Sequence, residues 1–248
     1  MNVDALDRIE TIRDRLQRNG RVRIAELAVD LGVSEMTIRR DLDLLTDQGV
    51  ARRIRGGAVA TGPQEFITRS REHPRAKAAI GDKLLALVPQ SGAIAVDASS
   101  TLQRLAARLG TVRDLTIVTN GPETFSALQE HTGVTALLSG GELDHRTGSL
   151  VGPLAVRAAH EVLLSRLFVS AAALDPVLGS SEATLADAAV KLAFAATAAE
   201  TVLAVDSSKL DSRAPARTFA VEDLTFLVTE LDPQDARLDP YRDRCEIL

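Results

Sequence analysis

The apolar positions of the first sixty residues recur at helical spacings. Leu6, Ile9, Ile12 and Leu16 stand three or four residues apart, as on one face of an amphipathic helix. Two further stripes follow, and a glycine stands where each helix would end. The pattern predicts three helices, over 4–18, 24–31 and about 35–48, with Ser34 as the N-cap of the third.

A short basic segment follows the third predicted helix. Residues 50–59 have the pattern of a small β-hairpin, with Gly56 and Gly57 at or near its turn or exit. Three helices followed by a basic hairpin predict a winged helix-turn-helix domain over 1–60. Residues 61–75 are polar and interrupted by glycine and proline, which predicts a linker.

From residue 76 the pattern changes to short apolar runs that alternate with helical stretches. Most of these runs are continuous, as in strands that are buried on both faces of a mainly parallel sheet. The sequence therefore predicts a larger α/β domain over 76–248. Its strands are expected at 93–96, 115–118, 134–138, 167–169, 202–205 and 226–228, and its helices at 76–87, 101–109, 123–130, 154–164 and 184–199.

The composition, with 45% hydrophobic and 25% charged residues, is globular and excludes a disordered chain. A net charge of −5 argues against a nucleic-acid binder when taken alone, but the charges are unevenly distributed. Residues 1–60 hold 11 Arg and 10 acidic residues, whereas the rest of the chain is acidic. The first aromatic residue is Phe66, so the basic segment cannot stack on bases, which counts against RNA and single-strand recognition.

Location and cofactors follow from what the sequence lacks. The chain begins with polar and acidic residues, has no apolar run of membrane-spanning length and contains one cysteine, Cys245. These features predict a cytoplasmic protein with no membrane segment and no disulfide. The four histidines lack metal-ligand spacing and no dinucleotide motif follows a strand, so no metal and no cofactor are expected.

The third predicted helix and the hairpin carry the candidate DNA contacts. The start of the helix would enter a major groove, and the hairpin guanidinium groups suit phosphates or a minor groove. The alternative for the helix arginines is an ion pair with Asp43, three or four residues away on a solvated surface. The candidate DNA-binding residues are Ser34, Glu35, Met36, Thr37, Arg39, Arg40, Arg52, Arg53, Arg55, Gly56 and Gly57.

Small, hydroxyl-rich segments follow four of the predicted strands. Ligands of open α/β sheets lie beyond the carboxyl ends of the strands, where hydroxyls, glycines and a lysine suit a phosphate. Lys209 closes one segment and is interpreted as a ligand contact, whereas Lys191, on an apolar helix, is interpreted first as reaching toward solvent. The candidate effector contacts are Asp97, Ser99, Ser100, Thr101, Thr119, Asn120, Gly140, Gly141, Asp206, Ser207, Ser208 and Lys209.

The first domain resembles the DNA-binding domain of the DeoR-type bacterial transcriptional regulators in three segments, 24–28 (IAELA), 31–42 (LGVSEMTIRRDL) and 52–58 (RRIRGGA). The later strand-end segments resemble the sensor domain of the same family, which shares its fold with ribose-5-phosphate isomerase. The resemblance implies a repressor that binds double-stranded operator DNA. It also implies a phosphorylated sugar or related metabolite as the effector.

The resemblance assigns further residues. It implies Lys191 as an effector contact and includes Lys77 and Gly152 among the matching positions. The chain departs from the family pattern after Asp97, at 170–173 and at Leu192, where glycines or a basic residue are usual. These departures leave the identity of the sugar open.

Three hypotheses about function follow. The first is a transcriptional regulator, expected as a homodimer or homotetramer because operators are commonly read as symmetric half-sites. The second is a sugar-phosphate isomerase-like enzyme with an accessory DNA-binding module, for which Asp97, Glu182 or Asp206 could supply the base. The third is a structural DNA-binding protein without a ligand response.

Overall fold

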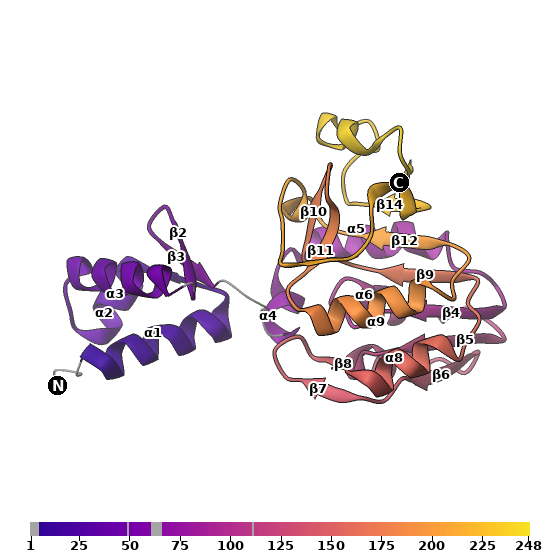
Figure 1. Cartoon of the computed structure of the whole chain (residues 1–248), viewed down its shortest axis with the longest axis horizontal. Coiled ribbons are helices and arrows are strands. Elements are labelled where there is room, and N and C mark those ends of the chain that lie inside the picture. Colours follow the sequence, from indigo (N-terminus) through magenta and orange to yellow (C-terminus); the bar gives the residue numbers. More distant parts are fainter. Residues whose placement is uncertain (1–4, 49, 61–65, 111) are drawn as a thin grey trace. The chain divides into compact units, whose positions relative to one another are not determined.

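The structure, a computed structural model, describes residues 5–48, 50–60, 66–110 and 112–248. The chain divides into two compact units, Met1–Arg69 and Ser70–Leu248 (Figure 1). Of the segment predicted as a linker, 61–65 lies outside the described residues, and Phe66–Arg71 forms helix α4. No helix among the described residues is long and apolar enough to cross a membrane.

The first unit packs three helices against a small antiparallel sheet. The stripe predicted for the first helix is buried at Ile12 and Leu16, which share one core with Ile38 and Leu42 of the third helix. Leu6 is 74% exposed, so this stripe begins later than predicted. The elements are α1 (Ala5–Asn19), β1 (Arg21–Arg23), α2 (Ile24–Leu31), α3 (Glu35–Asp47), β2 (Ala51–Ile54) and β3 (Gly57–Ala60).

Strand β1, which the sequence did not predict, extends the hairpin to a three-stranded sheet of order β1-β3-β2. β1 has three residues and buries only Val22, so it is too short to show a period. Gly57 is required beside it, because a Cβ at that position would lie 2.0 Å from the carbonyl oxygen of Val22. Gly56, with φ of 79°, provides the left-handed turn. Both glycines therefore shape the hairpin.

A buried ion pair joins α1 to α3. Arg8 donates to both carboxylate oxygens of Asp41, from Nε at 2.6 Å and from Nη2 at 3.2 Å. Asp41 is 7% exposed, and such bidentate, charge-assisted hydrogen bonds are among the strong ones in proteins. The ion pair therefore fixes the orientation of α3 relative to α1.

We expect Arg8→Met to lower the stability of the first unit by about 2 kcal/mol, because the Asp41 carboxylate loses its charged partner. Amide hydrogen exchange in α1 and α3 of the full chain would measure this. Arg15→Met is the matched control, since Arg15 pairs with Asp30 at the surface and such pairs contribute below about 1 kcal/mol. Equal protection losses in the two variants would contradict the assignment.

The second unit is built on a seven-stranded parallel sheet of order β15-β14-β12-β9-β4-β5-β6 (Figure 1). Each of the six apolar runs predicted as strands belongs to this sheet, so that prediction is confirmed. The last strand was not predicted, because two residues are too few to show a hydrophobic pattern. The strands are β4 (Gly92–Val96), β5 (Leu115–Thr119), β6 (Val134–Leu138), β9 (Arg166–Val169), β12 (Thr201–Ala204), β14 (Phe226–Val228) and β15 (Glu246–Ile247).

Helices cover both faces of the sheet. In β12, Val202 and Ala204 face one core, whereas Leu203 and the following Val205 face the other. A strand buried on both sides shows no polar alternation, which explains the continuous apolar runs. One face is covered by α5 (Pro74–Leu85), α6 (Leu102–Ala106) and α7 (Pro122–Leu128), and the other by α8 (Pro153–His160) and α9 (Leu185–Ala195).

Two small antiparallel elements, which the sequence did not predict, complete the second unit. The residues of β11 are Gly-Ser-Ser-Glu, yet all four are buried, so composition gave no indication of a strand there. The elements are the hairpin of β7 (Glu142–Asp144) with β8 (Ser149–Val151), and the sheet of β10 (Ala173–Asp175), β11 (Gly179–Glu182) and β13 (Ala216–Arg217).

Candidate nucleic-acid interface and effector site

The predicted N-cap of α3 is present. The Ser34 hydroxyl oxygen accepts a hydrogen bond from the backbone N–H of Thr37 at 3.2 Å, and the two hydroxyl oxygens lie 3.0 Å apart. The helix buries Ile38 and exposes Met36, which is 67% exposed. The cap fixes the residue at which α3 begins, and side chains of its first turn are exposed to solvent. A helix that enters a DNA groove requires both features.

The two arginines of α3 differ in their partners. Arg39 lies 3.2 Å from Glu35, one turn earlier on the helix, and both side chains are half exposed. Arg40 is exposed and forms no ion pair with another described residue. The alternative pairing of these arginines with Asp43 does not occur in the described structure, because a hairpin residue takes that carboxylate.

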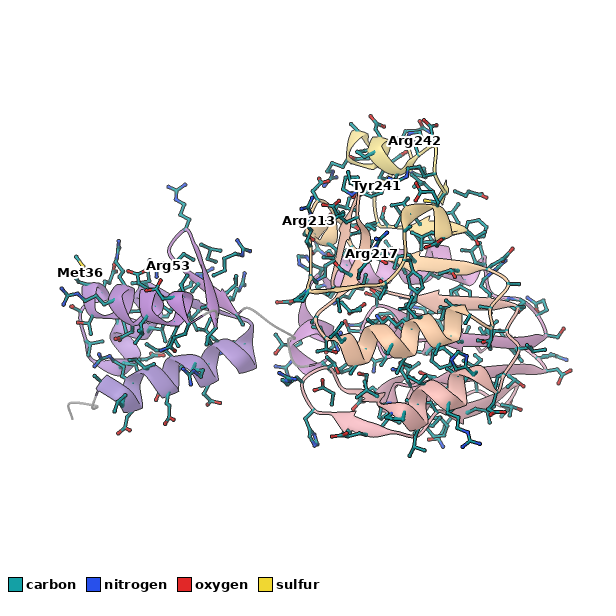
Figure 2. The ribbon with its side chains drawn as sticks, in the orientation of Figure 1. Met36, Arg53, Arg213, Arg217, Tyr241 and Arg242 are labelled. Atoms are coloured by element: carbon teal, nitrogen blue, oxygen red, sulfur yellow. The ribbon has the colours of Figure 1, made fainter. Side chains whose placement is uncertain are left out.

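That hairpin residue is Arg53, whose Nε lies 3.4 Å from Oδ1 of Asp43. Arg53 is half-buried beside α3 (Figure 2), and its Nη1 is buried without a hydrogen-bond partner among the described residues. Arg52 and Arg55, in contrast, are exposed. The three hairpin arginines, which the sequence did not distinguish, thus divide into one that faces α3 and two that are exposed.

At the carboxyl edge of the parallel sheet, Asp97 follows β4 and is 1% exposed. Its Oδ1 accepts from the backbone N–H of Ser99 at 2.8 Å, and its Oδ2 accepts from the N–H of Ser170 at 2.9 Å. Lys191 approaches the same Oδ2 to 2.9 Å. Asp97 therefore joins the loops after β4 and β9 and holds the cation of α9.

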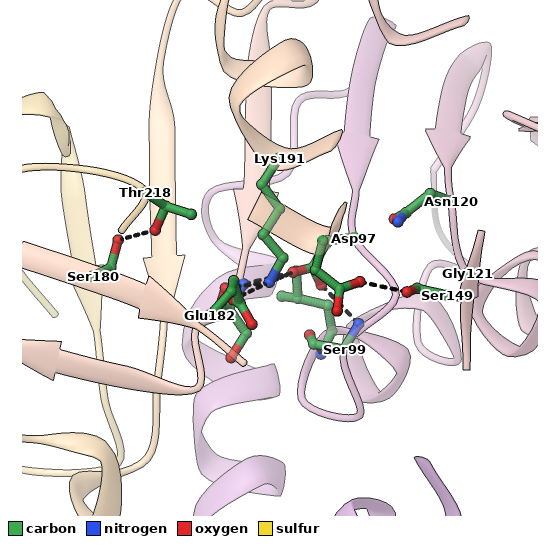
Figure 3. A network of polar contacts seen from close by, with 12 residues as sticks. Asp97, Ser99, Asn120, Gly121, Ser149, Ser180, Glu182, Lys191 and Thr218 are labelled. Atoms are coloured by element: carbon green, nitrogen blue, oxygen red, sulfur yellow. Dashed lines mark hydrogen bonds and ion pairs between the residues drawn. The ribbon is translucent and has the colours of Figure 1, made fainter. Parts of the chain in front are cut away.

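Lys191 is 8% exposed and lies inside the domain, so the interpretation that it reaches toward solvent was wrong. Its role as an effector contact stays a prediction. Its Nζ donates to Glu182 at 2.5 Å and to the carbonyl of Ser170 at 2.7 Å, between Glu182 and Asp97 (Figure 3). Burial alone would lower the pKa of Lys191, but the Asp97 and Glu182 carboxylates outweigh it and raise that pKa. Burial raises the pKa of Glu182.

A second buried carboxylate, Asp187, lies on the same helix. It accepts from the Ser149 hydroxyl at 2.5 Å and from the Thr184 hydroxyl at 2.9 Å, and Ser149 in turn lies 2.7 Å from the hydroxyl of Thr147. These residues were not predicted from the sequence. The polar loop before β8 and the N-cap of α9 were the available signals, and only the fold brings them together.

Asn120 follows β5 and is 1% exposed. Its Nδ2 donates to the carbonyl of Leu150 at 3.2 Å, while its Oδ1 is buried and has no hydrogen-bond partner among the described residues. The next residue, Gly121, has no room for a side chain, because a Cβ would lie 2.7 Å from the Cα of Ala98. Asn120 is thus held in place with one acceptor unused.

The other predicted residues near Asp97 have internal roles. Ser99 Oγ accepts from the backbone N–H of Leu102 at 3.1 Å, and Thr119 Oγ1 accepts from the N–H of Gly121 at 3.0 Å. Thr101 is buried beside them, and Lys77 donates to Ser100 Oγ at 3.0 Å. The loops after β4 and β5 therefore have a fixed conformation at this edge of the sheet.

The predicted glycine pair after β6 is partly structural. Gly141 has a φ of 121°, and a Cβ there would lie 2.6 Å from the carbonyl oxygen of Val151. Gly140 has a φ of 67° with open space around its Cα. Gly140 is the member of the pair that leaves room for a ligand.

The turn after β12 forms a separate group. Asp206 Oδ1 accepts from the backbone N–H of Ser208 at 3.1 Å, and Ser207 donates through its hydroxyl to Glu230 at 2.6 Å. Lys209 is half-buried, and its ammonium has no partner among the described residues. Within the described chain no hydrogen bond links this turn to the Asp97 network, so the predicted effector residues fall into two groups.

Two family models match the chain and together cover most of it. Residues 8–64 match the DeoR-like helix-turn-helix domain, and residues 72–231 match the DeoR C terminal sensor domain. The chain belongs to the DeoR family of transcriptional regulators. The first unit is therefore a DNA-binding domain and the second a sensor domain, as the resemblance implied.

Curated relatives span this regulator nearly from end to end. It is 30% identical to the HTH-type transcriptional regulator GlpR of Haloferax volcanii over 84% of its own length and 82% of the relative's. It is 30% identical to the lactose phosphotransferase system repressor of Lactococcus lactis over 82% of each chain. It is also 28% identical to a putative aga operon transcriptional repressor of Escherichia coli O157:H7, over 83% and 78% of the two chains.

Among solved structures, the regulator is similar to a D-ribose-5-phosphate isomerase in complex with phospho-erythronic acid. The TM-score is 0.42 and the sequence identity 16%, over 56% of this chain and 55% of that chain.

A hollow lies at the start of α5, before Lys77. It has a volume of about 420 Å³ and is lined by His73, Pro74, Arg75 and Ala76 at the start of α5. It contains none of the residues predicted to bind the effector.

Proposed function

We propose that this regulator is a cytoplasmic repressor of sugar-metabolism genes, and that a phosphorylated sugar bound at the carboxyl edge of the sheet releases it from its operator. The observation that carries the proposal is the unused acceptor of Asn120 in a region where hydroxyl-rich loops converge. A buried acceptor without a partner costs free energy until a donor such as a sugar hydroxyl satisfies it. Two relatives, named as a lactose phosphotransferase system repressor and a putative aga operon repressor, support a sugar effector.

The DNA side of the proposal assigns roles to the predicted residues. Arg40, Arg52 and Arg55 meet the duplex directly, because they are exposed and have no ion pair among the described residues. Ser34 and Thr37 fix the start of α3, and Arg53 holds the hairpin against it. Binding should weaken steeply with salt, since phosphate contacts release counterions.

A thermal-shift screen of the full chain with phosphorylated and unphosphorylated sugars tests the effector. A stabilising phosphorylated sugar that also lowers affinity for a duplex from the gene's own promoter is the expected result. Stabilisation of the chain by none of the sugars would overturn the proposal, and so would a ligand that binds without any change in DNA affinity.

Lys209→Ala should abolish ligand-induced release and leave DNA affinity unchanged, because its ammonium is the unpaired cation of the turn after β12. Titration of the variant against the sugar found in the screen measures this by the shift in operator affinity. Arg217→Ala, at an exposed position of β13, is the control and should respond as the parent does. An unchanged response of the lysine variant would remove Lys209 from the site.

Catalysis is the second candidate, and the raised pKa of Glu182 favours it, because a proton-transfer group works best with a pKa near the operating pH. We propose that the regulator is nonetheless not an enzyme. Glu182 is held by Lys191, and both oxygens of Asp97 are occupied by backbone N–H groups. A turnover assay on pentose and hexose phosphates decides between the two, and measurable isomerisation would refute this part of the proposal.

A further inference from the structure

Helix α9 buries its charged side chains and exposes two leucines. Asp187 and Lys191 are 5% and 8% exposed, whereas Leu185 is 79% exposed and Leu192 is 43% exposed. The buried side of the helix also holds Val190 and Phe194, so α9 is apolar nearly all round. A helix with that character is normally covered on every side.

The exposed side of α9 has a heptad pattern. Leu185, Ala189 and Leu192 of the helix and Ala196 at its C-cap follow this pattern, and all four are exposed, as is Ala186. The spacings of four, three and four residues place leucine at successive d positions and alanine at successive a positions, as in a coiled-coil seam. We call these four residues the α9 seam. No charged residue interrupts it.

The order of large and small side chains within the seam points to a second copy of the same helix. An antiparallel arrangement about a two-fold axis between Val190 and Lys191 would set Leu185 opposite Ala196 of the partner subunit and Ala189 opposite Leu192 of the partner subunit. Every leucine would then meet an alanine, which is the alternation of large and small that lets helices interdigitate closely. A two-fold interface must be self-complementary in this way.

The seam alone is too small for a stable dimer. An eleven-residue helix is about 16 Å long, while a standard interface covers roughly 800 Å² on each partner. The neighbouring helix supplies more apolar surface, because α8 lies beside α9 and exposes Leu154 at 69% (Figure 1). On α8, Leu154 adds to the apolar surface of the seam, and Pro153, Arg157 and His160 are exposed on the same helix.

We propose that the regulator forms a two-fold dimer in which the α9 seams of two sensor domains pack antiparallel. A dimer brings two DNA-binding domains together, as recognition of a symmetric operator requires. It also places the interface one residue from Lys191, whose ammonium is held by Asp97 and Glu182 on the other side of α9. An effector that alters the contacts of Lys191 would thereby move the seam; this last step rests on the proposed effector site.

Sedimentation of the full chain over a range of concentrations tests the dimer. We expect the parent to dimerise and Leu185→Glu with Leu192→Glu to weaken dimerisation at least a hundredfold, with far-ultraviolet circular dichroism unchanged because both side chains face solvent. Val177→Glu, at a position 76% exposed in the turn between β10 and β11, is the control and should dimerise as the parent does. A monomeric parent, or a dimer that persists in the double variant, would overturn the proposal.

Disulfide cross-linking tests the direction of the helices. In a Cys245→Ala background, chains with Leu185→Cys and chains with Ala196→Cys should cross-link when mixed and oxidised. Neither variant should cross-link with a second copy of itself, because the same residue of the two antiparallel helices would lie about 16 Å apart. Cross-linking of each variant with itself would indicate a parallel seam and contradict the proposal.

The step to the effector has its own measurement. The dimer dissociation constant is determined with and without the sugar that stabilises the chain in the thermal-shift screen. A change of at least threefold is expected. An unchanged dissociation constant at saturating sugar would refute the coupling between effector and dimer, but neither the dimer nor the effector site itself. If no sugar stabilised the chain, only the effector site would be refuted.

Discussion

Replacement of Lys191 by methionine is expected to cause the largest loss of stability in the sensor domain, about 3–5 kcal/mol. The substitution keeps most of the side-chain volume and removes only the ammonium. Asp97 and Glu182 would then remain as two buried carboxylates without their shared cation, and breaking one side of a buried ion pair costs far more than the intact pair contributes. Urea unfolding of the full chain, followed by hydrogen exchange in α9 and β4, measures the loss.

Two further variants separate this cause from general damage to α9. Lys191→Met combined with Glu182→Gln should recover part of the stability, because one uncompensated charge is gone. Lys209→Met, at a half-exposed lysine, should change stability by less than about 0.5 kcal/mol. If the double variant were no more stable than Lys191→Met, the loss would have to come from packing.

The pH dependence of Lys191→Met follows from Glu182. Burial already raises the pKa of this carboxyl in the parent, and Lys191 acts to lower it, so loss of the lysine raises that pKa further. A group whose folded-state pKa is raised contributes stability that is lost as the pH rises through that pKa. The deficit of the variant should therefore shrink as the pH falls through the raised pKa that Glu182 has in the variant. A deficit that stays constant over the whole pH range in which both proteins fold would show that Glu182 is not the uncompensated group.

Helix α9 shows which features of the structure could not be predicted from the sequence. Its apolar periodicity predicted a helix there, and the helix is present at Leu185–Ala195. The same pattern suggested that Lys191 reaches toward solvent, whereas the structure buries its ammonium between Asp97 and Glu182. A local pattern cannot report that Asp97 and Glu182, from distant strands, supply partners that make burial of an ammonium favourable.

Where the controlling interactions are local, the sequence was sufficient. Ser34 was predicted as the N-cap of α3, and its hydroxyl accepts the Thr37 N–H. The buried strands were predicted because burial on both faces removes every polar position. The small sheet that carries Glu182 was missed, because its strands consist of short polar stretches that only tertiary contacts order.

A salt titration of operator binding should divide the hairpin arginines into two classes. Each phosphate contact contributes about 0.9 to the slope of log affinity against log salt concentration, so Arg52→Ala with Arg55→Ala should reduce the slope by about 2. Both side chains are exposed. Arg53→Ala should weaken binding with the slope unchanged, because this guanidinium faces Asp43 and acts by placing the hairpin. A slope reduced by about 1 in Arg53→Ala would make Arg53 a phosphate contact instead.

Asp43→Asn is the decisive companion to Arg53→Ala, since the two interpretations give it opposite signs. If Arg53 met the phosphate backbone, removal of a nearby negative charge would strengthen DNA binding, because it raises the positive potential of the surface. If the Asp43–Arg53 ion pair holds the hairpin against α3, the same substitution weakens binding, because the hairpin loses its attachment. We expect the weaker binding, with a slope equal to that of the parent. Tighter binding by Asp43→Asn would show that Arg53 belongs to the surface that contacts DNA, and that all three arginines of the hairpin face the duplex.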